Sequence, residues 1–588
     1  MVSHPVPSDR VAGRTSARRA DARVAAGLAL LLAAGACTHG GRGARDPRPI
    51  DARAASAERA GARDSRDDAS LGDPRAGNPW FAAGRREVER STRFVGDAPP
   101  ARNVILFVGD GMSVATVTAA RILEDQRRGG PGEENRLAFE RLSHVALVKT
   151  YTVDSQVPDS AGTMTAIMTG VKTKTGVLGV DERVRRGRYE SVEGARVPTL
   201  LEEAEDRGLA TGIVTTTSVT HATPAACYAH APIRFWEDDS RLLPEAREGG
   251  FPDIARQLLE PRHGDGLEVA LGGGRRHFRP AGEPDPEDPV AAGARLDGRD
   301  LTREWTEGRP GSVYVWRSDA FRALDPARTT RLLGLFEPGD MHWEADRARD
   351  AAGEPSLAEM TEVAIDLLAR DPDGYFLMVE GGRIDHGHHA GSAYHALGDT
   401  VAFSDAVDVA LRETDPRDTL VVVTADHGHT LTLAGYPKRG NPILGRVVSL
   451  DWSAEDRVRV GLDAMNLPYT TLSYANGPGY TGGSSDQPEG PHRLGHSPGA
   501  ARPPYACDDR GITHGRPDLT PVDTTAPDYL QEATVPMLQE THGGEDVAVY
   551  AGGARAALFH GVQEQSYLYH AMVEALGWTR AGEPVPGR

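Results

Sequence analysis

Short runs of apolar residues alternate with longer amphipathic segments along the chain from Asn103 onward. In segments such as 113–126 and 355–370, apolar residues recur every three or four positions, which is typical of helices with one buried face. Continuous runs rich in β-branched residues are typical of strands that are covered on both faces of a sheet. The pattern therefore predicts an α/β fold with a mainly parallel central sheet and helices on both faces. The predicted strands are NVILFV (103–108), VALVKTY (145–151), TGIVTTT (211–217), YFLMVEG (375–381), TLVVVTA (419–425) and DVAVYA (546–551).

Two other parts of the chain break this pattern. Residues 430–540 are dense in Gly, Pro and Ser, and we predict an inserted surface subdomain there, because so long an unstructured loop is improbable inside a compact core. Residues 38–95 are rich in Arg, Ala, Asp and Gly and poor in large apolar side chains, so they are predicted to form a disordered linker. The main folded domain is predicted to span 96–580.

Residues 1–37 have the pattern of an export signal. Arginines precede the apolar run VAAGLALLLAAGA, which is too short to span a bilayer as a helix of the mature protein. Cys37 ends the box AAGAC and is a candidate lipidation site. We therefore predict an exported protein, with a lipid-anchored cell-surface form as the alternative to a periplasmic or extracellular one. Cys227 and Cys507 could pair in an oxidising compartment, but their spacing does not predict it.

The composition excludes several classes of partner. Hydrophobic residues at 39% and charged residues at 26% are typical of a globular protein. The formal net charge of −19 argues against nucleic acid, and against an anionic membrane surface, as the main partner. Clustered acidic residues can instead bind metal ions.

Acidic residues and histidines follow the ends of several predicted strands. Asp110 follows the first of them, Glu380 lies at the end of another, Asp426 and His427 follow a third, and His542 shortly precedes the last. Each alone has an ordinary structural explanation, such as a turn or a buried histidine. Ligand sites of open parallel sheets form at the carboxyl ends of strands, so we expect these residues to meet in one crevice.

The stretch EGGRIDHGHHAG (380–391) is the most informative motif. If the chain is helical from Asp385, that residue and His389 are four positions apart on one helix face, a spacing that suits two ligands of one zinc ion. A solvated polar helix start is the usual explanation of such a pair. Its position directly after a buried strand that ends in Glu380 favours the metal site.

Ser160, within QVPDSAGTMTA (156–166), is predicted at a turn into a helix. It has the setting of a nucleophile, but no histidine is near it in sequence, and neither G-x-S-x-G nor S-x-x-K is present. A dication at roughly 4 Å would attract a developing oxyanion by about 8 kcal/mol before desolvation, at an effective dielectric of about 20. A metal ion beside Ser160 would thus replace the missing base.

Arg234 ends a further motif, THATPAACYAHAPIR (220–234). An arginine in such a loop is usually a surface charge. Near a phosphate it would instead act as a bidentate clamp, which lysine could not reproduce.

Taken together, the motifs resemble those of the alkaline phosphatase family, in the animal rather than the enteric bacterial form. The resemblance covers about Asn103 to Leu576. It implies a metal-dependent hydrolase of phosphate monoesters with broad substrate tolerance, which acts through a phosphoserine intermediate. The motifs in chain order are GDGM, TAARIL, QVPDSAGT, GVKT, THATP, GGGR, GLFEPGDM, EGGRIDHGHH, TADHGH, NGPGY, THGGEDV and GVQEQ.

The resemblance implies a role for each candidate residue. Ser160 would be the nucleophile and Arg234 the phosphate clamp, although HAPIR departs from the usual HSADR. His221 and His386 would lie just outside the metal ligands. Two Zn²⁺ ions and one Mg²⁺ ion are implied. The first zinc would be bound by Asp385, His389 and His542, the second by Asp426, His427 and the bridging carboxylate of Asp110, and the magnesium by Asp110, Thr223 and Glu380.

A calcium site, as in the animal enzymes, is also implied. Glu287, the carbonyl of Phe336 and Glu337 would be ligands, with Glu354 or Asp350 as the fourth. The family resemblance further implies a homodimer. Two alternatives to the phosphatase remain open at this point: a phosphodiesterase with the same two-zinc core, and a non-catalytic exported lipoprotein that binds phosphate or metal.

Overall fold

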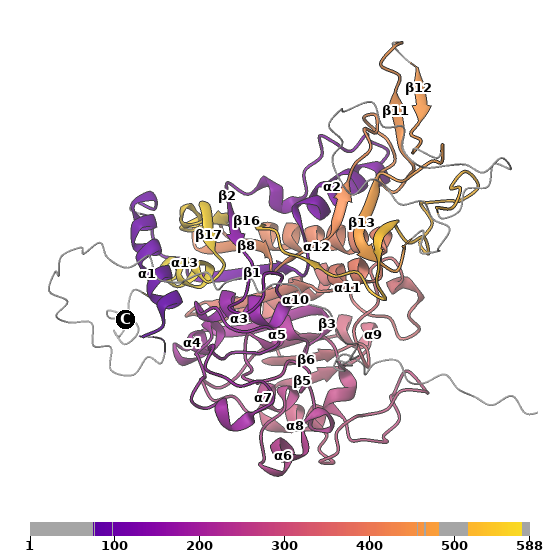
Figure 1. Cartoon of the computed structure of the whole chain (residues 1–588). Helices are drawn as coiled ribbons and strands as arrows, with labels where there is room; N and C mark the ends of the chain where they lie inside the picture. The colour runs from indigo at the N-terminus through magenta and orange to yellow at the C-terminus, as the bar shows by residue number, and fades with distance from the viewer. Residues whose placement is uncertain are drawn as a thin grey trace, which may run out of the picture. The chain divides into compact units, whose positions relative to one another are not determined.

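The central element of the protein is a ten-stranded sheet, seen in the computed structural model in Figure 1. The model describes residues 75, 77–96, 98–454, 457–463, 466–480 and 516–578. The strand order is β17-β2-β16-β8-β1-β7-β3-β4-β6-β5. The strands are β1 (Asn103–Gly109), β2 (His144–Lys149), β3 (Ala210–Ser218), β4 (Val269–Gly273), β5 (Ser312–Val315), β6 (Arg331–Leu335), β7 (Tyr375–Gly381), β8 (Thr419–Ala425), β16 (Val547–Gly553) and β17 (Gly561–Glu564).

All pairings in this sheet are parallel except the two made by β16, which is antiparallel to β2 and β8. The predicted α/β class and mainly parallel sheet are therefore confirmed, and all six predicted strands are present. Strands β1, β7 and β8 are buried along almost their whole length, which explains why their sequences are continuously apolar rather than alternating.

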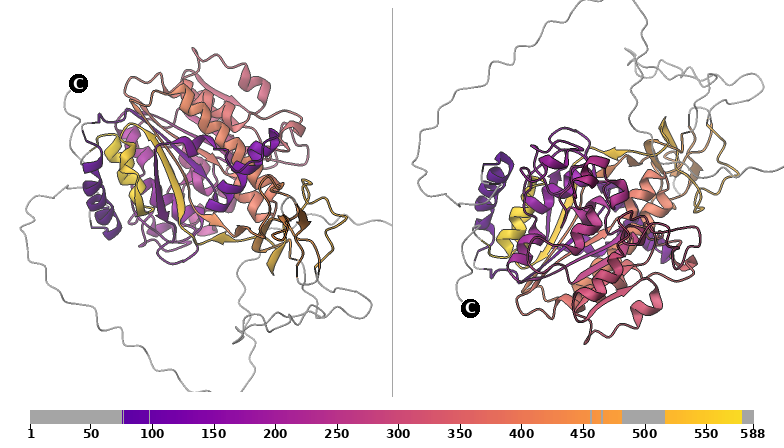
Figure 2. Two further views of the ribbon diagram at one scale, coloured as in Figure 1. Left: turned by 90° about the horizontal axis from the view of Figure 1, so that it is seen from above. Right: turned by 90° about the horizontal axis from the view of Figure 1, so that it is seen from below.

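Two groups of helices cover the sheet, and Figure 2 shows them on opposite faces. One group consists of α2 (Val114–Arg127), α10 (Leu357–Leu368) and α12 (Ala393–Glu413). The other consists of α3 (Ser160–Thr169), α4 (Leu200–Asp206), α5 (Ala222–Ala225) and α13 (Tyr567–Ala575). Four other helices lie in the connections: α6 (Pro244–Glu248), α7 (Ile254–Leu259), α8 (Leu301–Gly308) and α9 (Ser318–Arg322).

A smaller set of strands lies within residues 430–540, the range predicted as an inserted subdomain. Three of them form a separate sheet: β10 (Leu431–Leu433), β13 (Leu472–Gly477) and β14 (Ala533–Pro536). A hairpin of β11 (Val448–Leu450) and β12 (Val458–Val460) projects from it (Figure 1).

Helix α1 (Pro79–Ser91) corrects the predicted linker, which was expected to extend to residue 95. The side chain of Asn78 caps the helix by accepting hydrogen bonds from the backbone of residues 80 and 81. Phe81 and Val88 are buried where α1 packs on α13. Two apolar residues are too few to mark a folded segment by composition. They are nevertheless enough to hold the helix in place once a partner helix covers them.

Several predictions concern residues outside the described part of the chain. The export signal, Cys37 and Cys507 all lie there. Cys227 is buried, and burial raises the pKa of its thiol well above the usual value. None of the described helices combines the length and apolarity needed to cross a bilayer.

Candidate functional site

The candidate site begins at the carboxyl ends of three adjacent strands. In the register of the sheet, Gly109 of β1 lies beside Gly381 of β7 and Ala425 of β8. Asp110 and Asp426 directly follow these positions, and Glu380 immediately precedes one of them. Three carboxylates far apart in sequence are therefore neighbours because their strands are in register.

Helix α11 (Arg383–His389) adds Asp385 and His389 from one face, as the spacing predicted. His389 Nε2 lies 3.4 Å from Asp385 Oδ2. His542 comes from β15 (His542–Gly543), which pairs with β9 (Gly428–His429). Its Nε2 lies 3.4 Å from Asp385 Oδ1 and 3.1 Å from His389 Nε2. Three possible donor atoms thus converge on one point, as the ligands of a single metal ion do.

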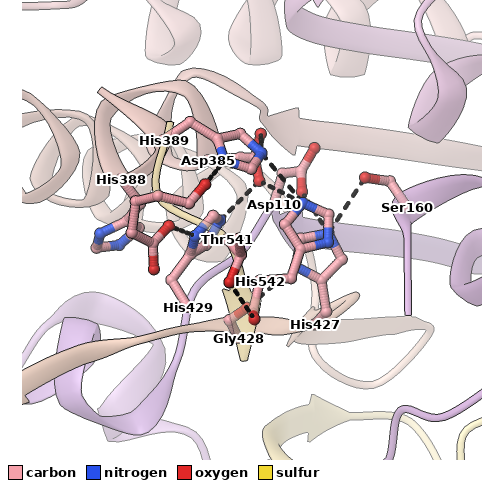
Figure 3. A network of polar contacts seen from close by, with 12 residues as sticks. Asp110, Ser160, Asp385, His388, His389, His427, Gly428, His429, Thr541 and His542 are labelled. Atoms are coloured by element: carbon pink, nitrogen blue, oxygen red, sulfur yellow. Dashed lines mark hydrogen bonds and ion pairs between the residues drawn. The ribbon is translucent and has the colours of Figure 1, made fainter. Parts of the chain in front are cut away.

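A second group surrounds Ser160, the first residue of α3 (Figure 3). Ser160 Oγ lies 3.2 Å from His427 Nε2. The same nitrogen lies 3.3 Å from Asp110 Oδ1 and 3.3 Å from Asp426 Oδ2. The serine that lacked a neighbour in sequence therefore has an imidazole and two carboxylates beside it in space.

A third group lies on the other side of Asp110. Asp110, His221 and Glu380 offer ligand atoms within 4.8 Å of one another. Both carboxylate oxygens of Asp110, one of Glu380 and the hydroxyl of Thr223 are buried and accept or donate no hydrogen bond among the described residues. Buried polar atoms are rarely left in this way, so their state points to a bound cation.

The raised pKa values of the buried carboxyl groups agree with a cation site. Burial, together with Asp426, Asp385 and Glu380, raises the pKa of Asp110 well above its usual value. Burial and the charge of Asp426 raise the pKa of Glu380 to about 7, against hydrogen bonds from threonines. Buried carboxylates that repel one another ionise readily only when positive charge is supplied.

His429 is part of this site but was not predicted. Its Nε2 donates to Asp385 Oδ1 at 2.6 Å, and its Nδ1 donates to Glu540 Oε2 at 2.5 Å. Burial opposes its charge, but Glu540 and Asp385 raise its pKa to about 10. Burial likewise opposes ionisation of Asp385, yet His389 and His429 hold its pKa well below the usual value. A signal existed in TADHGH, since residues two apart in a strand share a face.

Arg234 lies at the edge of the site, with 13% of its side chain exposed. Its Nη1 donates to Asp159 Oδ2 at 3.0 Å, directly before Ser160, and its Nη2 lies 3.1 Å from His221 Nε2. The His221 and His386 rings are 5.5 Å apart. Burial, then Arg234 and His386, lower the pKa of His221 to about 4, so this ring is neutral. The guanidinium is therefore held beside Asp159, the residue that precedes Ser160.

The residues predicted to bind calcium form a separate acidic cluster. Glu287, Glu337 and Asp350 offer oxygens within 4.8 Å of one another, and Glu337 also lies within that distance of Glu354 and His342. The carbonyl of Phe336 accepts a hydrogen bond of 3.1 Å from Arg275. Burial, then Glu287 and Asp350, raise the pKa of Glu337 to about 8. Both proposed fourth ligands are thus adjacent to Glu337.

Comparison with known proteins agrees with this geometry. The alkaline phosphatase family model matches residues 101–578. The tissue-nonspecific alkaline phosphatase of Gallus gallus is 46% identical over 481 residues, which are 81% of this chain and 84% of that protein. The Homo sapiens isozyme is 43% identical over 81% of this chain and 83% of its own length.

Solved structures show the same fold. The alkaline phosphatase of Thermus thermophilus has a TM-score of 0.54 at 26% identity, and the match covers 83% of this chain and 93% of that one. The enzyme of the Antarctic bacterium TAB5 has a TM-score of 0.52 at 21% identity, over 82% and 99% of the two chains. The resemblance seen in the sequence motifs, including its animal character, is therefore confirmed. The chain belongs to the alkaline phosphatase family, the enzymes that hydrolyse phosphate monoesters.

Proposed function

We propose that this alkaline phosphatase works through Ser160 as a covalent nucleophile, beside two zinc ions and one magnesium ion. The observation that carries the proposal is the position of Ser160 Oγ. It lies 3.2 Å from His427 Nε2, a nitrogen that belongs to a cluster of buried carboxylates and histidine. One zinc ion would be held by Asp385, His389 and His542, the other by Asp426, His427 and Asp110, and the magnesium ion by Asp110, Thr223 and Glu380.

The donor chemistry fits these metals. Imidazole and carboxylate ligands suit zinc, whereas an all-oxygen set of two carboxylates and a hydroxyl suits magnesium. The oxygens of Asp110 and the one oxygen of Glu380 that take part in no hydrogen bond among the described residues support this division. One related structure, a mutant TAB5 alkaline phosphatase, is described with Mg bound in its M3 site. When bound, such ions supply positive charge that lowers the pKa of a nearby hydroxyl and stabilises the oxygens that enter and leave phosphorus.

The protein's own groups account for the remaining steps. Arg234 binds two oxygens of the phosphate through its guanidinium, which Asp159 and His221 hold in place. Ser160 gives up its proton to solvent and its Oγ attacks phosphorus, while the bond between phosphorus and the ester oxygen breaks. The leaving oxygen takes a proton from solvent and departs as the alcohol. Water then attacks the phosphoserine, which releases inorganic phosphate and restores the hydroxyl. Capping by Asp159 orients the first turn of α3 and hence Ser160.

Three further proposals concern the molecule outside the catalytic groups. The acidic cluster of Glu287, Glu337 and Asp350, with the buried Glu354 beside it, would bind calcium, since these half-buried carboxylates repel one another. The protein would be exported, with Cys37 as a candidate lipid attachment site. It would act as a homodimer, and its mass in solution by light scattering would test this.

Replacement of the nucleophile tests the central proposal. Ser160→Ala should reduce hydrolysis of p-nitrophenyl phosphate to the assay background, and labelled phosphate should no longer be trapped on the protein by acid quenching. Ser453→Ala, an exposed serine of the surface subdomain, is the control and should behave as wild type. Unchanged hydrolysis by Ser160→Ala would overturn the assignment. No observation favours a phosphodiesterase or a non-catalytic binding protein.

A further inference from the structure

An exposed aromatic side chain, Phe235, lies directly after Arg234 at the edge of the site. It is 63% exposed, and its ring centroid lies 5.7 Å from the guanidinium carbon of Arg234. Single exposed apolar residues are common and usually need no explanation. Phe235 differs from these because Arg234 precedes it. The ester group of a phosphate bound by Arg234 would lie within reach of the Phe235 ring.

The backbone around Phe235 is held from both sides. The Arg234 N–H donates to the carbonyl of Gly176 at 3.0 Å, and the Ile254 N–H donates to the carbonyl of Trp236 at 2.9 Å. Trp236 is 2% exposed and packs with Leu242 and other members of a small apolar cluster. Phe235 therefore lies on a turn that is already held in place, so little conformational entropy is lost when a ligand binds to it.

We propose that Phe235 is a specificity-determining residue, whose ring stacks against the planar aromatic leaving group of a phosphate monoester. This inference rests on the proposed function, since Arg234 must hold the phosphate. Aromatic faces stack on aryl rings and on nucleobases alike, because each has a π-face. Two classes of phosphate monoester carry such an aromatic group. Aryl phosphates carry the ring directly on the ester oxygen. Nucleoside monophosphates carry the base on a pentose, which lies between the base and the ester oxygen. The enzyme would still hydrolyse many phosphate monoesters, but it would bind those with an aromatic leaving group more tightly.

Steady-state kinetics with three substrates would test the proposal. We would measure kcat and KM for p-nitrophenyl phosphate, adenosine 5′-monophosphate and glycerol 2-phosphate in the wild type, Phe235→Ala and Phe235→Tyr. Phe235→Ala should raise KM about 3- to 10-fold for one or both aromatic substrates, with kcat nearly unchanged, because stacking contributes to ground state and transition state alike. Glycerol 2-phosphate should be unaffected, and Phe235→Tyr should behave as wild type.

The pattern of effects identifies which class is preferred. A response of p-nitrophenyl phosphate alone supports an aryl ring, and a response of the nucleotide supports a base. As an independent readout, Phe235→Ala should weaken competitive inhibition by phenylphosphonate more than inhibition by methylphosphonate. Leu538 is 98% exposed, and Leu538→Ala is the control. It should change inhibition by neither phosphonate.

Two results would overturn the inference: KM values that rise equally for all three substrates, or KM values that change for neither aromatic one. Failure of the proposed function is a separate outcome. In that case Ser160→Ala would hydrolyse all three substrates as the wild type does, whereas normal turnover of glycerol 2-phosphate by Phe235→Ala shows that the catalytic groups are intact.

Discussion

At the scale of single residues, the least expected contact is the one between His429 and two carboxylates. The ring bridges Asp385 and Glu540 through both nitrogens, so neither nitrogen retains a free lone pair for a metal ion. Gly111 permits this approach, because a Cβ there would lie 2.3 Å from the His429 ring. We interpret Glu540 and His429 as a support that orients Asp385 rather than as further ligands.

Glu540→Gln should therefore weaken metal retention without removing a ligand. The loss of a carboxylate that orients a ligand through a histidine typically costs 10- to 100-fold in metal affinity. Zinc content after dialysis against graded chelator concentrations would measure this, with the exposed Glu362→Gln as the control. Identical zinc retention in the two variants would contradict the interpretation.

His277 offers a pH-dependent test at the same scale. It is fully buried, with Nδ1 2.5 Å from Asp238 Oδ2 and Nε2 3.1 Å from Glu237 Oε2. Burial opposes its charge, but Glu237 and Asp238 raise its pKa to about 9. Because the folded-state pKa lies above the unfolded value, this stabilisation is complete below about pH 6.5. It is lost as pH rises through 9.

We therefore expect part of the free energy of unfolding, on the order of 3 kcal/mol, to disappear between pH 6.5 and 10. Urea unfolding at several pH values would measure it. In His277→Gln the corresponding decline should be absent, although the variant is less stable throughout. An equal decline in both proteins would assign the pH dependence to other groups.

At the scale of elements, the contact of α1 with α13 depends on one glycine. A Cβ at Gly84 would lie 2.2 Å from Cδ2 of His570, so the two helices can approach this closely only without a side chain there. Alanine favours an isolated helix by about 1 kcal/mol over glycine. The clash should outweigh that gain.

Gly84→Ala should accordingly lower the melting temperature rather than raise it. Arg86→Ala, at an exposed position of the same helix, is the matched control and should change stability little. Differential scanning calorimetry of the two variants would decide. A higher melting temperature for Gly84→Ala would mean that α1 does not pack on α13 as described.

At the scale of the whole molecule, metal ions and the fold should stabilise each other. Asp110, Glu380, Asp385 and Asp426 bring four carboxylates into one buried region. An ion present at about a thousand times its Kd stabilises the native state by about 4 kcal/mol. Chelation should abolish activity and lower the melting temperature, and zinc with magnesium should restore both. A melting temperature that chelation leaves unchanged would argue against these ions.

The sequence by itself determined the local elements and most of the candidate ligands. The runs at 103–108 and 419–425 indicated buried strands, and the spacing of Asp385 and His389 places both on one face if the segment is helical. These inferences succeeded because periodicity and spacing act within a few residues. The short helix α1 was missed because its stability comes from the partner helix and not from its own composition.

Only the tertiary structure decided how distant parts meet. The order β8-β1-β7 brings Asp110 between Glu380 and Asp426, and the pairing of β15 with β9 brings in His542. The bridge from His429 to Glu540 likewise joins residues that lie far apart in the chain. Such contacts join residues separated by long loops, so their geometry follows from how the whole core packs rather than from any one segment.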